Sequence, residues 1–556
     1  ERVAPRTPVE RRLAEVWCDV LGVAEVGVHD SLFDLGGNSL VAIQLVSRIR
    51  QDLGVEIPLR QLFEVPTVAA VALAVGRARA ETAGTAGRVE DTFPVLVPDL
   101  AGRHLPFPLN DVQQAYWIGR TDAFEMGNVA SHGYREVEVR GLDLDRLTAA
   151  FRRLIDRHDM LRAVIDAGGE QRILPEVPSY EIAVTDLRGR PANEVEAALA
   201  SLREEMSHQV LAADRWPLFD VRATLLDGDA DGGGGRPPRV RLHISVDILL
   251  VDAWSARILA RELGTLYADL DAPLVPLELS FRDYVLAERE MAESDWYRRA
   301  RDYWFDRLGT LPPAPELPMV KAPAELEHPR FARREAILRP APWSKVKERA
   351  GRLGVTPSGV VLAAFAEVLA RWSKDPRFTI NLTLFNRLPF HRQVDDIVGD
   401  FTSLTLLEVD AAGGDCFEVR ARRLQEQLWQ DLEHRYIGGV QVMRELARRR
   451  GGGAGALMPV VFTSALFGDT GGQSLTSAGG LEESEGIYGI SQTPQVWLDH
   501  QVSEAEGSLV FNWDTVDELF PAGLLDDMFG EYVALLERLA SEEAAWSGSA
   551  GPWAVA

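Results

Sequence analysis

The sequence is poor in cysteine, with only Cys18 and Cys416 among its 556 residues. Two cysteines cannot form a disulfide framework or a four-thiolate metal site, so both kinds of stabilised scaffold are excluded. No run of about 18 apolar residues is present to span a membrane, and the opening ERVAPRTPVE is not an apolar signal segment. We therefore expect a cytoplasmic chain that does not enter a membrane.

Positive charge is also scarce, because 59 Lys and Arg residues stand against 84 Asp and Glu residues, for a formal net charge of -25. Nucleic acids and anionic membranes bind through basic surfaces, so neither is expected as a main partner. The sequence also lacks a Walker loop, a GxGxxG motif and a GxSxG elbow. These absences remove the commonest nucleotide-binding and serine-hydrolase signatures.

The residues that are present have the composition of a globular protein, with 46% hydrophobic and 26% charged side chains. A chain of 556 residues is too long for a single core, and its length favours three or four compact units. The chain begins with Glu1 rather than Met, which favours a piece of a longer protein.

Residues 5–79 have the pattern of a small all-helical unit. Thr7 and Glu10 form a capping box around Pro8 at the first helical position, and an apolar stripe then continues to Gly22. The first helix is therefore predicted to begin after Thr7 and to end before Gly22.

Three more helices are predicted in this unit, from Ser39 to Leu53, around residues 59–63 and around residues 67–75. Together they would make a four-helix bundle. Residues 80–103 are rich in Ala, Gly and charge without a sustained period, which predicts a flexible linker after the bundle.

The entry to the second helix reads DLGGNSL, from Asp34 to Leu40. Two glycines make a tight turn there, and Ser39 stands at a helix N-terminus, where free N–H groups and the helix dipole favour a phosphate. A serine at this position is more often a simple cap. The motif in its four-helix context resembles the attachment site of peptidyl and acyl carrier proteins. This resemblance implies that Ser39 carries a 4'-phosphopantetheine arm.

Residues 239–255, RVRLHISVDILLVDAWS, predict a strand followed by a helix. Apolar residues alternate with polar ones up to Asp247, and Asp252 precedes the helical pattern in a DxxxxDxxS arrangement that closes on Ser255. Asp252 has the position of an ordinary helix N-cap. Asp247, at the inner end of an apolar strand, requires a partner or a proton.

From His104 onward strand-like and helix-like patterns alternate, which predicts an α/β unit of two lobes, 104–275 and 276–547. A capped helix is expected from Pro357 to Trp372. Surface loops are predicted at residues 229–238, 448–456 and 468–486.

Six further stretches accompany the DxxxxD run in a fixed order. They are FPLNDVQQAYWIGR (107–120), RHDMLRAVIDAGGEQ (157–171), LPPAPELPMVKAP (311–323), GDFTSLTLL (399–407), PVVFTSAL (459–466) and SQTPQVWLD (491–499), with Trp513-Asp514 after them. The series resembles the motifs of the heterocyclization domains of nonribosomal peptide synthetases, over essentially the whole chain after the linker.

These domains are relatives of condensation domains, whose signature here is HHxxxDG. Asp247 and Ile248 stand where the two histidines would be, Asp252 matches the retained Asp, and Ala253 replaces Gly. His243 cannot supply the missing imidazole, because five residues of strand separate it from position 248 by about 17 Å. An ordinary amide-forming condensation domain is therefore disfavoured.

The resemblance implies a multidomain fold, in which a carrier bundle precedes two chloramphenicol-acetyltransferase-like lobes set in a V around a tunnel. It implies that the amine of a cysteinyl, seryl or threonyl thioester attacks the acyl thioester on the carrier. The side-chain thiol or hydroxyl then closes on the new amide, and loss of water gives a thiazoline or oxazoline.

The implied partners are domains of a parent synthetase. They are an upstream module that donates the acyl chain, a downstream aminoacyl carrier with its adenylation domain, and the phosphopantetheinyl transferase that modifies Ser39.

Asp499 is the candidate acid/base for the loss of water, a step to which such a group contributes roughly 100- to 10,000-fold. Gln495, Trp497 and Asp499 are predicted to share one side of an extended run, so the carboxylate projects into a cavity beside an aromatic ring. An apolar wall would raise its pKa. The alternative is a carboxylate held in a structural salt bridge.

Thr463 matches a position that the resemblance implies is catalytic together with this aspartate, although a threonine in a strand is usually a packing residue. Asp247 is expected to pair with an arginine across the lobe interface, and Asp252 to cap its helix. Asn381, Gln492 and Ser255 are candidate polar residues of the tunnel. Asn381 has an alternative role in satisfying backbone groups near its own turn.

Two other functions remain open. The large domain could be an inactive docking platform, although its Asp499, Thr463, Asp247 and Asp252 are intact. It could also condense without cyclizing, or epimerize, but epimerization would be expected to use the absent histidine.

Overall fold

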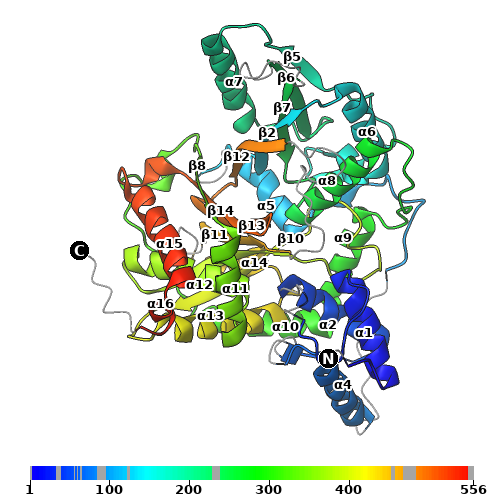
Figure 1. Ribbon diagram of the computed structural model, residues 1–556, viewed down its shortest axis with the longest axis vertical. Helices are drawn as coiled ribbons and strands as arrows, with labels where there is room; N and C mark the ends of the chain where they lie inside the picture. The colour runs from blue at the N-terminus through cyan, green and yellow to red at the C-terminus, as the bar shows by residue number, and fades with distance from the viewer. Residues whose placement is uncertain are drawn as a thin grey trace.

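The structure is a computed structural model of the chain. It describes residues 3–32, 35, 39–55, 57–58, 61–62, 65–83, 96–121, 126–227, 238–451, 457–467 and 484–548. Figure 1 shows a small helical unit below two larger layered lobes, with the chain running from blue to red.

The helical unit contains α1 (Pro8–Leu21), α2 (Ser39–Leu53) and α4 (Val68–Ala83). The predicted capping box is confirmed, since the Thr7 side chain accepts from the Glu10 N–H and the Glu10 carboxylate accepts from the Thr7 N–H. Gly22 ends α1 in the left-handed conformation, with φ 67°. The helices pack through buried apolar side chains, among them Trp17, Leu45 and Ile49.

Helix α4 continues to Ala83, past the predicted start of the linker at residue 80. Most of the predicted short helix at 59–63 and the linker residues 84–95 lie outside the described residues.

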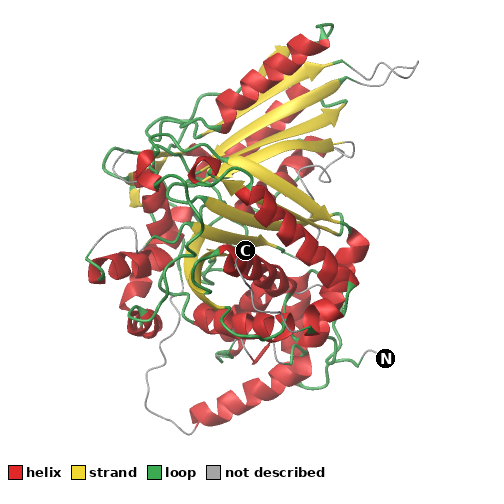
Figure 2. Ribbon diagram, turned by 90° about the vertical axis from the view of Figure 1, so that its left-hand side faces the viewer, coloured by secondary structure: helices red, strands yellow, loops and turns green. Residues whose placement is uncertain are grey.

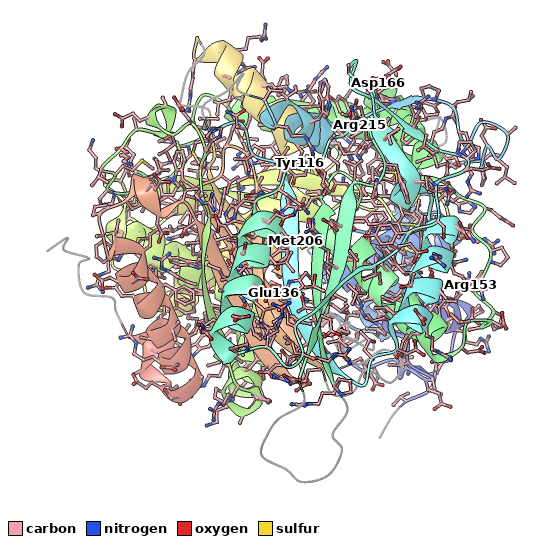
Figure 3. All side chains as sticks on the ribbon, turned by 90° about the horizontal axis from the view of Figure 1, so that it is seen from above. Tyr116, Glu136, Arg153, Asp166, Met206 and Arg215 are labelled. Atoms are coloured by element: carbon pink, nitrogen blue, oxygen red, sulfur yellow. The ribbon has the colours of Figure 1, made fainter. Side chains whose placement is uncertain are left out.

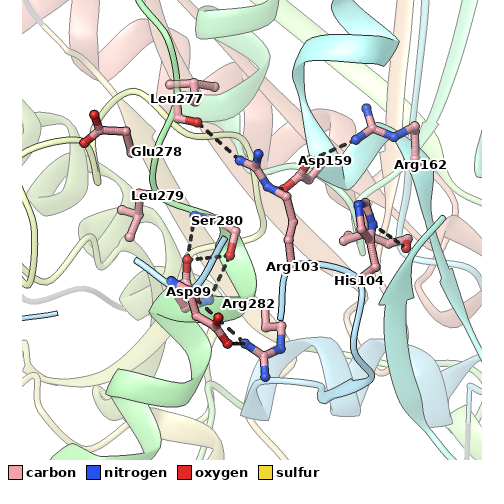
Figure 4. Close-up of polar contacts among 12 residues, drawn as sticks. Asp99, Arg103, His104, Asp159, Arg162, Leu277, Glu278, Leu279, Ser280 and Arg282 are labelled. Carbon is pink, nitrogen blue, oxygen red and sulfur yellow. Dashed lines mark hydrogen bonds and ion pairs between the residues drawn. The ribbon is translucent and has the colours of Figure 1, made fainter. Parts of the chain in front are cut away.

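The segment after the linker is fixed to the larger unit by polar contacts (Figure 4). Arg103 pairs with Asp159 at 2.6 Å, and Arg282 pairs with Asp99 at 3.3 Å. The His104 ring lies 3.2 Å from the carbonyl oxygen of Ile173. Leu96 is also buried and donates its N–H to the Phe390 carbonyl at 3.1 Å, so the chain is held from residue 96 onward, inside the linker predicted at 80–103.

The N-terminal lobe is built on a five-stranded sheet in the order β12-β2-β7-β6-β5. Helix α7 covers one face of the sheet, and α6 and α8 lie against the other (Figure 1). The bounds are β2 (His132–Arg140), β5 (Ala183–Asp186), β6 (Phe219–Leu226), β7 (Arg239–Asp247), β12 (Ser484–Gln492), α6 (Leu144–Arg157), α7 (Ala192–Ser207) and α8 (Ala253–Ala268).

The alternating strand predicted around residues 239–247 is β7, and its polar side is buried rather than solvated. His243 is fully buried and its ring lies 2.9 Å from the Tyr134 hydroxyl. Glu136, on the same face of β2, receives two hydrogen bonds from Arg203 of α7. In Figure 3, Met206 on α7 and Glu136 lie together where this helix crosses the strands. Both faces of the sheet are therefore covered.

The C-terminal lobe is built on a six-stranded sheet in the order β10-β9-β11-β13-β14-β8. The bounds are β8 (Ala332–Leu338), β9 (Arg377–Phe385), β10 (Thr402–Asp410), β11 (Val460–Ala465), β13 (Leu498–Ala505) and β14 (Ser508–Thr515). Its helices are α11 (Pro340–Leu353), α12 (Pro357–Trp372), α13 (Phe417–Glu433), α14 (Gly439–Arg449), α15 (Leu524–Ser541) and α16 (Ala544–Ser547).

Helix α12 has the bounds that the sequence predicted, with the Thr356 hydroxyl accepting from the Gly359 N–H. The lobes are tied together by β12, which follows α14 in the chain but pairs with β2 of the N-terminal lobe. Figure 2 shows the two sheets as successive layers with helices outside them, which confirms the predicted two-lobed α/β fold class.

The remaining elements connect these layers. They are β1 (Phe107–Pro108), β3 (Ala163–Ile165) and β4 (Glu170–Ile173), which form a small sheet, and the helices α5 (Asp111–Gly119), α9 (Phe281–Glu290) and α10 (Asp295–Arg307). In the described ranges no single helix has the length and apolarity of a membrane span, whereas α11 and α12, bent by 99°, meet that criterion only as a pair.

Candidate functional site

A cavity of about 1440 Å³ lies between the two sheets. Its C-terminal-lobe wall is a polar face of the six-stranded sheet, and its N-terminal-lobe wall includes β2, β7 and α8. The polar lining includes Asn381, Thr383, Thr463, Ser491, Asp499, Gln501 and Asn512. Both residues of the predicted catalytic pair, Asp499 and Thr463, therefore line the same cavity.

Cross-strand register explains why these polar groups lie together. Asp499 of β13 is paired with Asp514 of β14, which is paired with Arg333 of β8. Side chains of register partners project from the same face of a sheet. Three charged groups, far apart in the sequence, therefore form one row across three strands.

Only one of the two carboxylates in this row has an arginine. Arg333 donates from Nε and Nη2 to the two oxygens of Asp514, at 2.7 and 2.6 Å. Asp499 Oδ2 instead accepts from neutral donors, the Gln501 amide at 2.7 Å and the Ser491 hydroxyl at 3.4 Å. Its Oδ1 has no hydrogen-bond partner in the described part of the chain.

Burial, and next the negative charge of Asp514, raise the pKa of Asp499 to about 7. A carboxyl group with that pKa exists in both protonation states near neutral pH, which general acid/base chemistry requires. The direction agrees with the sequence prediction. The salt-bridge alternative fits Asp514 rather than Asp499.

Thr463 lies on β11 one row away, paired with Gln501 on β13 and with Thr383 on β9. Its hydroxyl donates to the Thr383 hydroxyl at 2.9 Å and not to Asp499. The two candidate catalytic groups are thus diagonal neighbours on adjacent strands, with cavity beside both.

The extended run predicted before Asp499 is wrong in its first part. A turn at Pro494 and Gln495 separates β12 from β13, and Gln495 has a positive φ of 61°. Pro494, Gln495 and Val496 line the cavity, but Trp497 is not among the lining residues. A turn breaks the two-residue alternation on which the prediction depended.

The partners of the DxxxxD carboxylates differ from those expected. Asp247 is buried and pairs with Arg120 at the end of α5, in the same lobe, rather than across the lobe interface. It is Asp252 that pairs across the lobes, with Arg387 at 3.2 Å. Asp252 also accepts from the Ser255 N–H at 2.6 Å, so its predicted N-cap role is confirmed.

Two of the three candidate tunnel residues lie elsewhere. The Ser255 hydroxyl is buried and donates to the Gly399 carbonyl at 2.7 Å, so it joins backbone segments. Gln492 is buried, and its neighbour Ser491 faces the cavity instead, because successive strand residues point to opposite faces. Asn381 does line the cavity, with its amide 3.4 Å from the Met458 carbonyl oxygen.

Sequence reasoning did not assign roles to Ser491, Gln501, Arg333 or Asp514. The alternation of LDHQ after residue 497 places Gln501 with Asp499, and that signal was available. The pairing of β14 with β8 was not, because it joins residues about 180 positions apart.

A second, narrower cavity of about 140 Å³ begins at the helical unit. Gln44 and Arg48 of α2 line its outer end, and Thr383, Phe385 and Phe467 line both this cavity and the large one. The two cavities therefore share lining residues, and the smaller one is lined in part by α2, the helix that begins at Ser39.

Helix α2 also contacts the C-terminal lobe directly. The Arg50 guanidinium lies 4.2 Å from the centre of the Trp296 ring and donates to the Tyr436 hydroxyl at 3.3 Å. The Gln44 amide donates to Asp395 at 3.3 Å. In the described residues no group of three His, Cys, Asp or Glu side chains is placed to hold a metal ion.

Comparisons with known proteins agree with this architecture. Residues 107–545 match the condensation domain family, and residues 11–75 match the phosphopantetheine attachment site family. Pyochelin synthetase PchF of Pseudomonas aeruginosa is 43% identical over 451 residues, and phenyloxazoline synthase MbtB of Mycobacterium tuberculosis is 38% identical over 545 residues. These matches cover 81% and 96% of this chain but only 24% and 36% of the relatives.

Among solved structures, the cyclization-docking bidomain of the nonribosomal peptide synthetase EpoB from Sorangium cellulosum is similar to this chain. It superposes with a TM-score of 0.76 and 44% identity, covering 86% of this chain and 93% of that one. The synthetase FmoA3 superposes with a TM-score of 0.72 and 35% identity, covering 83% of this chain and 45% of that one. The chain therefore belongs to the condensation domain family of nonribosomal peptide synthetases, in its heterocyclization branch, with a carrier domain that bears covalent 4'-phosphopantetheine.

Proposed function

We propose that this chain joins an acyl group held on its own carrier domain to a cysteinyl, seryl or threonyl thioester on a downstream carrier, and then cyclodehydrates the product. The product is a thiazoline or an oxazoline. The observation that carries the proposal is the buried, arginine-free Asp499 beside Thr463 in a cavity that both lobes line.

The first step forms an amide and needs mainly positioning. The amine attacks the acyl thioester, the C–N bond forms, the C–S bond breaks and a thiol leaves. A thioester is already activated, so holding two tethered reactants together supplies a large part of the barrier. The cavity between the lobes provides that positioning.

The second step needs a proton on a poor leaving group. The side-chain thiol or hydroxyl adds to the amide carbon, and the resulting hydroxyl group must leave as water while a C=N bond forms. With its pKa raised to about 7, neutral Asp499 is present to give the departing hydroxyl a proton. The resulting carboxylate then takes the proton that nitrogen loses, so the acid is regenerated.

Thr463 assists this proton transfer. Its hydroxyl is held by Thr383 at 2.9 Å and lies one register pair from Asp499, so it is placed to hydrogen-bond the departing oxygen. Gln501 and Ser491 donate to Asp499 Oδ2, which leaves Oδ1 for the substrate.

Ser39 is the proposed attachment site. Phosphopantetheine supplies the thiol that holds the acyl group as a thioester. Arg50 and Gln44 hold α2 against the C-terminal lobe, with the narrow cavity beginning beside the same helix. The upstream module, the downstream aminoacyl carrier, the adenylation domain and the phosphopantetheinyl transferase are the remaining proposed partners.

Intact mass spectrometry of reconstituted carriers tests the proposal. The chain is converted to its acyl form by a phosphopantetheinyl transferase and an acyl coenzyme A, and is mixed with a cysteinyl-loaded carrier. The expected product on the acceptor is one water lighter than the linear amide thioester. Finding only the linear amide contradicts the cyclodehydration. Ser39→Ala is the control, because it should remain unloaded.

A further inference from the structure

One arm of the large cavity runs between the five-stranded sheet and helices α6 and α8. Its lining there is apolar and comes from five elements, namely Val137 of β2, Phe151 of α6, Val221 of β6, Ile244 and Val246 of β7, and Leu259 and Leu263 of α8. Ile244, Val246 and Leu263 are only partly buried although they lie inside the domain. Space therefore remains beside these side chains.

Arg135 is the exception in this apolar wall. It sits on β2 between two register partners, Ile244 of β7 and Gly489 of β12, and its side chain opens to the cavity. No described residue forms a hydrogen bond or an ion pair with it, unlike Arg333 close by, which Asp514 holds. The Arg135 side chain is exposed to the space of the cavity, and the charge of Glu335 acts on it without a hydrogen bond or an ion pair.

Gly489 gives the Arg333 side chain its room. A Cβ atom on Gly489 would lie 2.7 Å from Nη1 of Arg333, so the bare backbone there lets the Arg333 side chain pass. Ser491, two residues after Gly489 on β12, donates hydrogen bonds from its hydroxyl to both Asp499 and Asp514. Arg135 therefore lies at the junction of the apolar arm and the proposed reaction centre.

The Arg135 side chain is exposed to the cavity in the absence of a ligand. Desolvation by the surrounding protein, and next the charge of Arg333, lower the pKa of Arg135, whereas the charge of Glu335 opposes both effects. A wholly apolar ligand that filled the arm would remove the remaining water from the guanidinium and leave the charge without a partner. A ligand that carries an anionic oxygen would satisfy it with a charge-assisted hydrogen bond.

We infer that this arm binds the acyl group of the donor thioester, and that the preferred acyl group has an apolar body with a carboxylate that Arg135 receives. The inference rests on the proposed function. The donor is the better candidate than the acceptor, because the arm is lined by apolar side chains from five elements, whereas a cysteinyl, seryl or threonyl group is small. The whole cavity, with the proposed reaction centre included, has a volume of about 1440 Å³, which exceeds the ordinary range of ligand pockets, about 300 to 1,000 Å³.

Matched acyl donors test the inference. Ser39 is loaded with butyryl or succinyl, hexanoyl or adipoyl, and octanoyl or suberoyl groups, with acetyl as the reference. The rate of amide formation with a cysteinyl carrier is measured as linear plus cyclic product. A hydrogen bond to a charged group contributes roughly tenfold to a hundredfold, so at least one dicarboxylic donor should exceed its monocarboxylic partner by that factor.

Arg135→Met should remove this preference, so that no dicarboxylic donor exceeds its monocarboxylic partner. Arg190→Met is the matched control, because Arg190 is 59% exposed and pairs only with Glu194 on the surface. Ile244→Trp, which fills the arm, should slow the hexanoyl and octanoyl donors while sparing acetyl.

Equal rates within every donor pair, or a preference that survives in Arg135→Met, would overturn the inference. So would an Ile244→Trp variant that slows all donors equally. The measured rate includes linear and cyclic product, so it does not depend on ring closure. If no donor gives a ring, the proposed heterocyclization fails, while the inference about the donor site is still tested by the amide rates.

Discussion

Asp499 and Asp514 are direct cross-strand partners on β13 and β14, yet only Asp514 is paired with an arginine, Arg333. The negative charge of Asp514 makes ionisation of Asp499 harder. Two identical side chains therefore acquire different chemistry from their surroundings, as required where one holds structure and the other exchanges protons.

The pH dependence of ring closure tests this relationship. If neutral Asp499 is the acid, the cyclodehydration rate should fall as pH rises through about 7. Asp514→Asn removes the neighbouring negative charge and frees Arg333, and both changes lower the pKa of Asp499. The descending limb should therefore move to lower pH in Asp514→Asn, as measured by single-turnover rates from pH 5 to 9.

Asp526→Asn is the control for this shift, because Asp526 is 68% exposed and pairs with Arg334 on the surface. If the cyclodehydration rate of Asp514→Asn falls over the same pH range as that of the original chain, another group controls the proton transfer.

The stability of the folded chain should also depend on Asp499. Its folded pKa lies above the usual value, so the folded state binds more protons than the unfolded state between about pH 4 and 7. This group therefore lowers the free energy of unfolding as pH rises through that window. Asp499→Asn should be as stable as the original chain at pH 4 and more stable at pH 8, in urea unfolding. Equal stabilities at pH 8 would contradict the raised pKa.

The hydroxyl of Thr463 is predicted to act in ring closure and not in amide formation. Thr463→Val keeps the branched shape and removes the donor, so cyclodehydration should fall roughly tenfold to a hundredfold, as for one lost hydrogen bond to a reacting group. Thr463→Ser should retain most of the rate. The ratio of cyclic to linear product in a time course distinguishes these outcomes, and equal ratios for all three proteins would exclude the role.

The buried pair of Asp252 and Arg387 is predicted to hold the lobes together. Asp252→Asn keeps an N-cap side chain but removes the carboxylate that is ion-paired with Arg387, which should cost up to about 3–5 kcal/mol of unfolding free energy. The double variant Asp252→Asn with Arg387→Met should recover much of this loss. A single variant as stable as the original would show that the pair contributes little.

Delivery of the acyl group from the carrier domain to the cavity is predicted to depend on Trp296, because the Arg50 guanidinium of the carrier packs over its ring. Trp296→Ala should slow transfer from acylated Ser39 but not from a soluble acyl-pantetheine thioester, which needs no docking surface. The two donors are compared in the same protein by product mass. Equal slowing of both would point to a general defect of the C-terminal lobe.

Local sequence patterns predicted the elements well where the determinants are local. The capping box of Thr7 and Glu10, the caps Asp252 and Thr356, and the alternation of β7 all correspond to observed features. Motif resemblance placed Asp499 and Thr463, which line one cavity.

Features that depend on distant pairing were not predictable in this way. The partner of Asp247 is Arg120, 127 residues away, and nothing in either neighbourhood specifies the other. The prediction that Gln492 lines the cavity was wrong, since Ser491 lines it instead. Successive residues of a strand point to opposite faces of the sheet, so an error of one residue exchanges the two sides. The turn at Gln495 interrupts the alternation of faces before Asp499, and no glycine at that position indicates a turn in the sequence.

The most direct test of the account is the product distribution of Asp499→Asn. Asparagine keeps the size of the side chain and cannot supply an acidic proton, so cyclodehydration should fall roughly 100- to 10,000-fold while amide formation continues at its original rate. Intact mass of the acceptor carrier should then show the linear amide accumulating. Ring formation at an undiminished rate in Asp499→Asn would contradict the central claim.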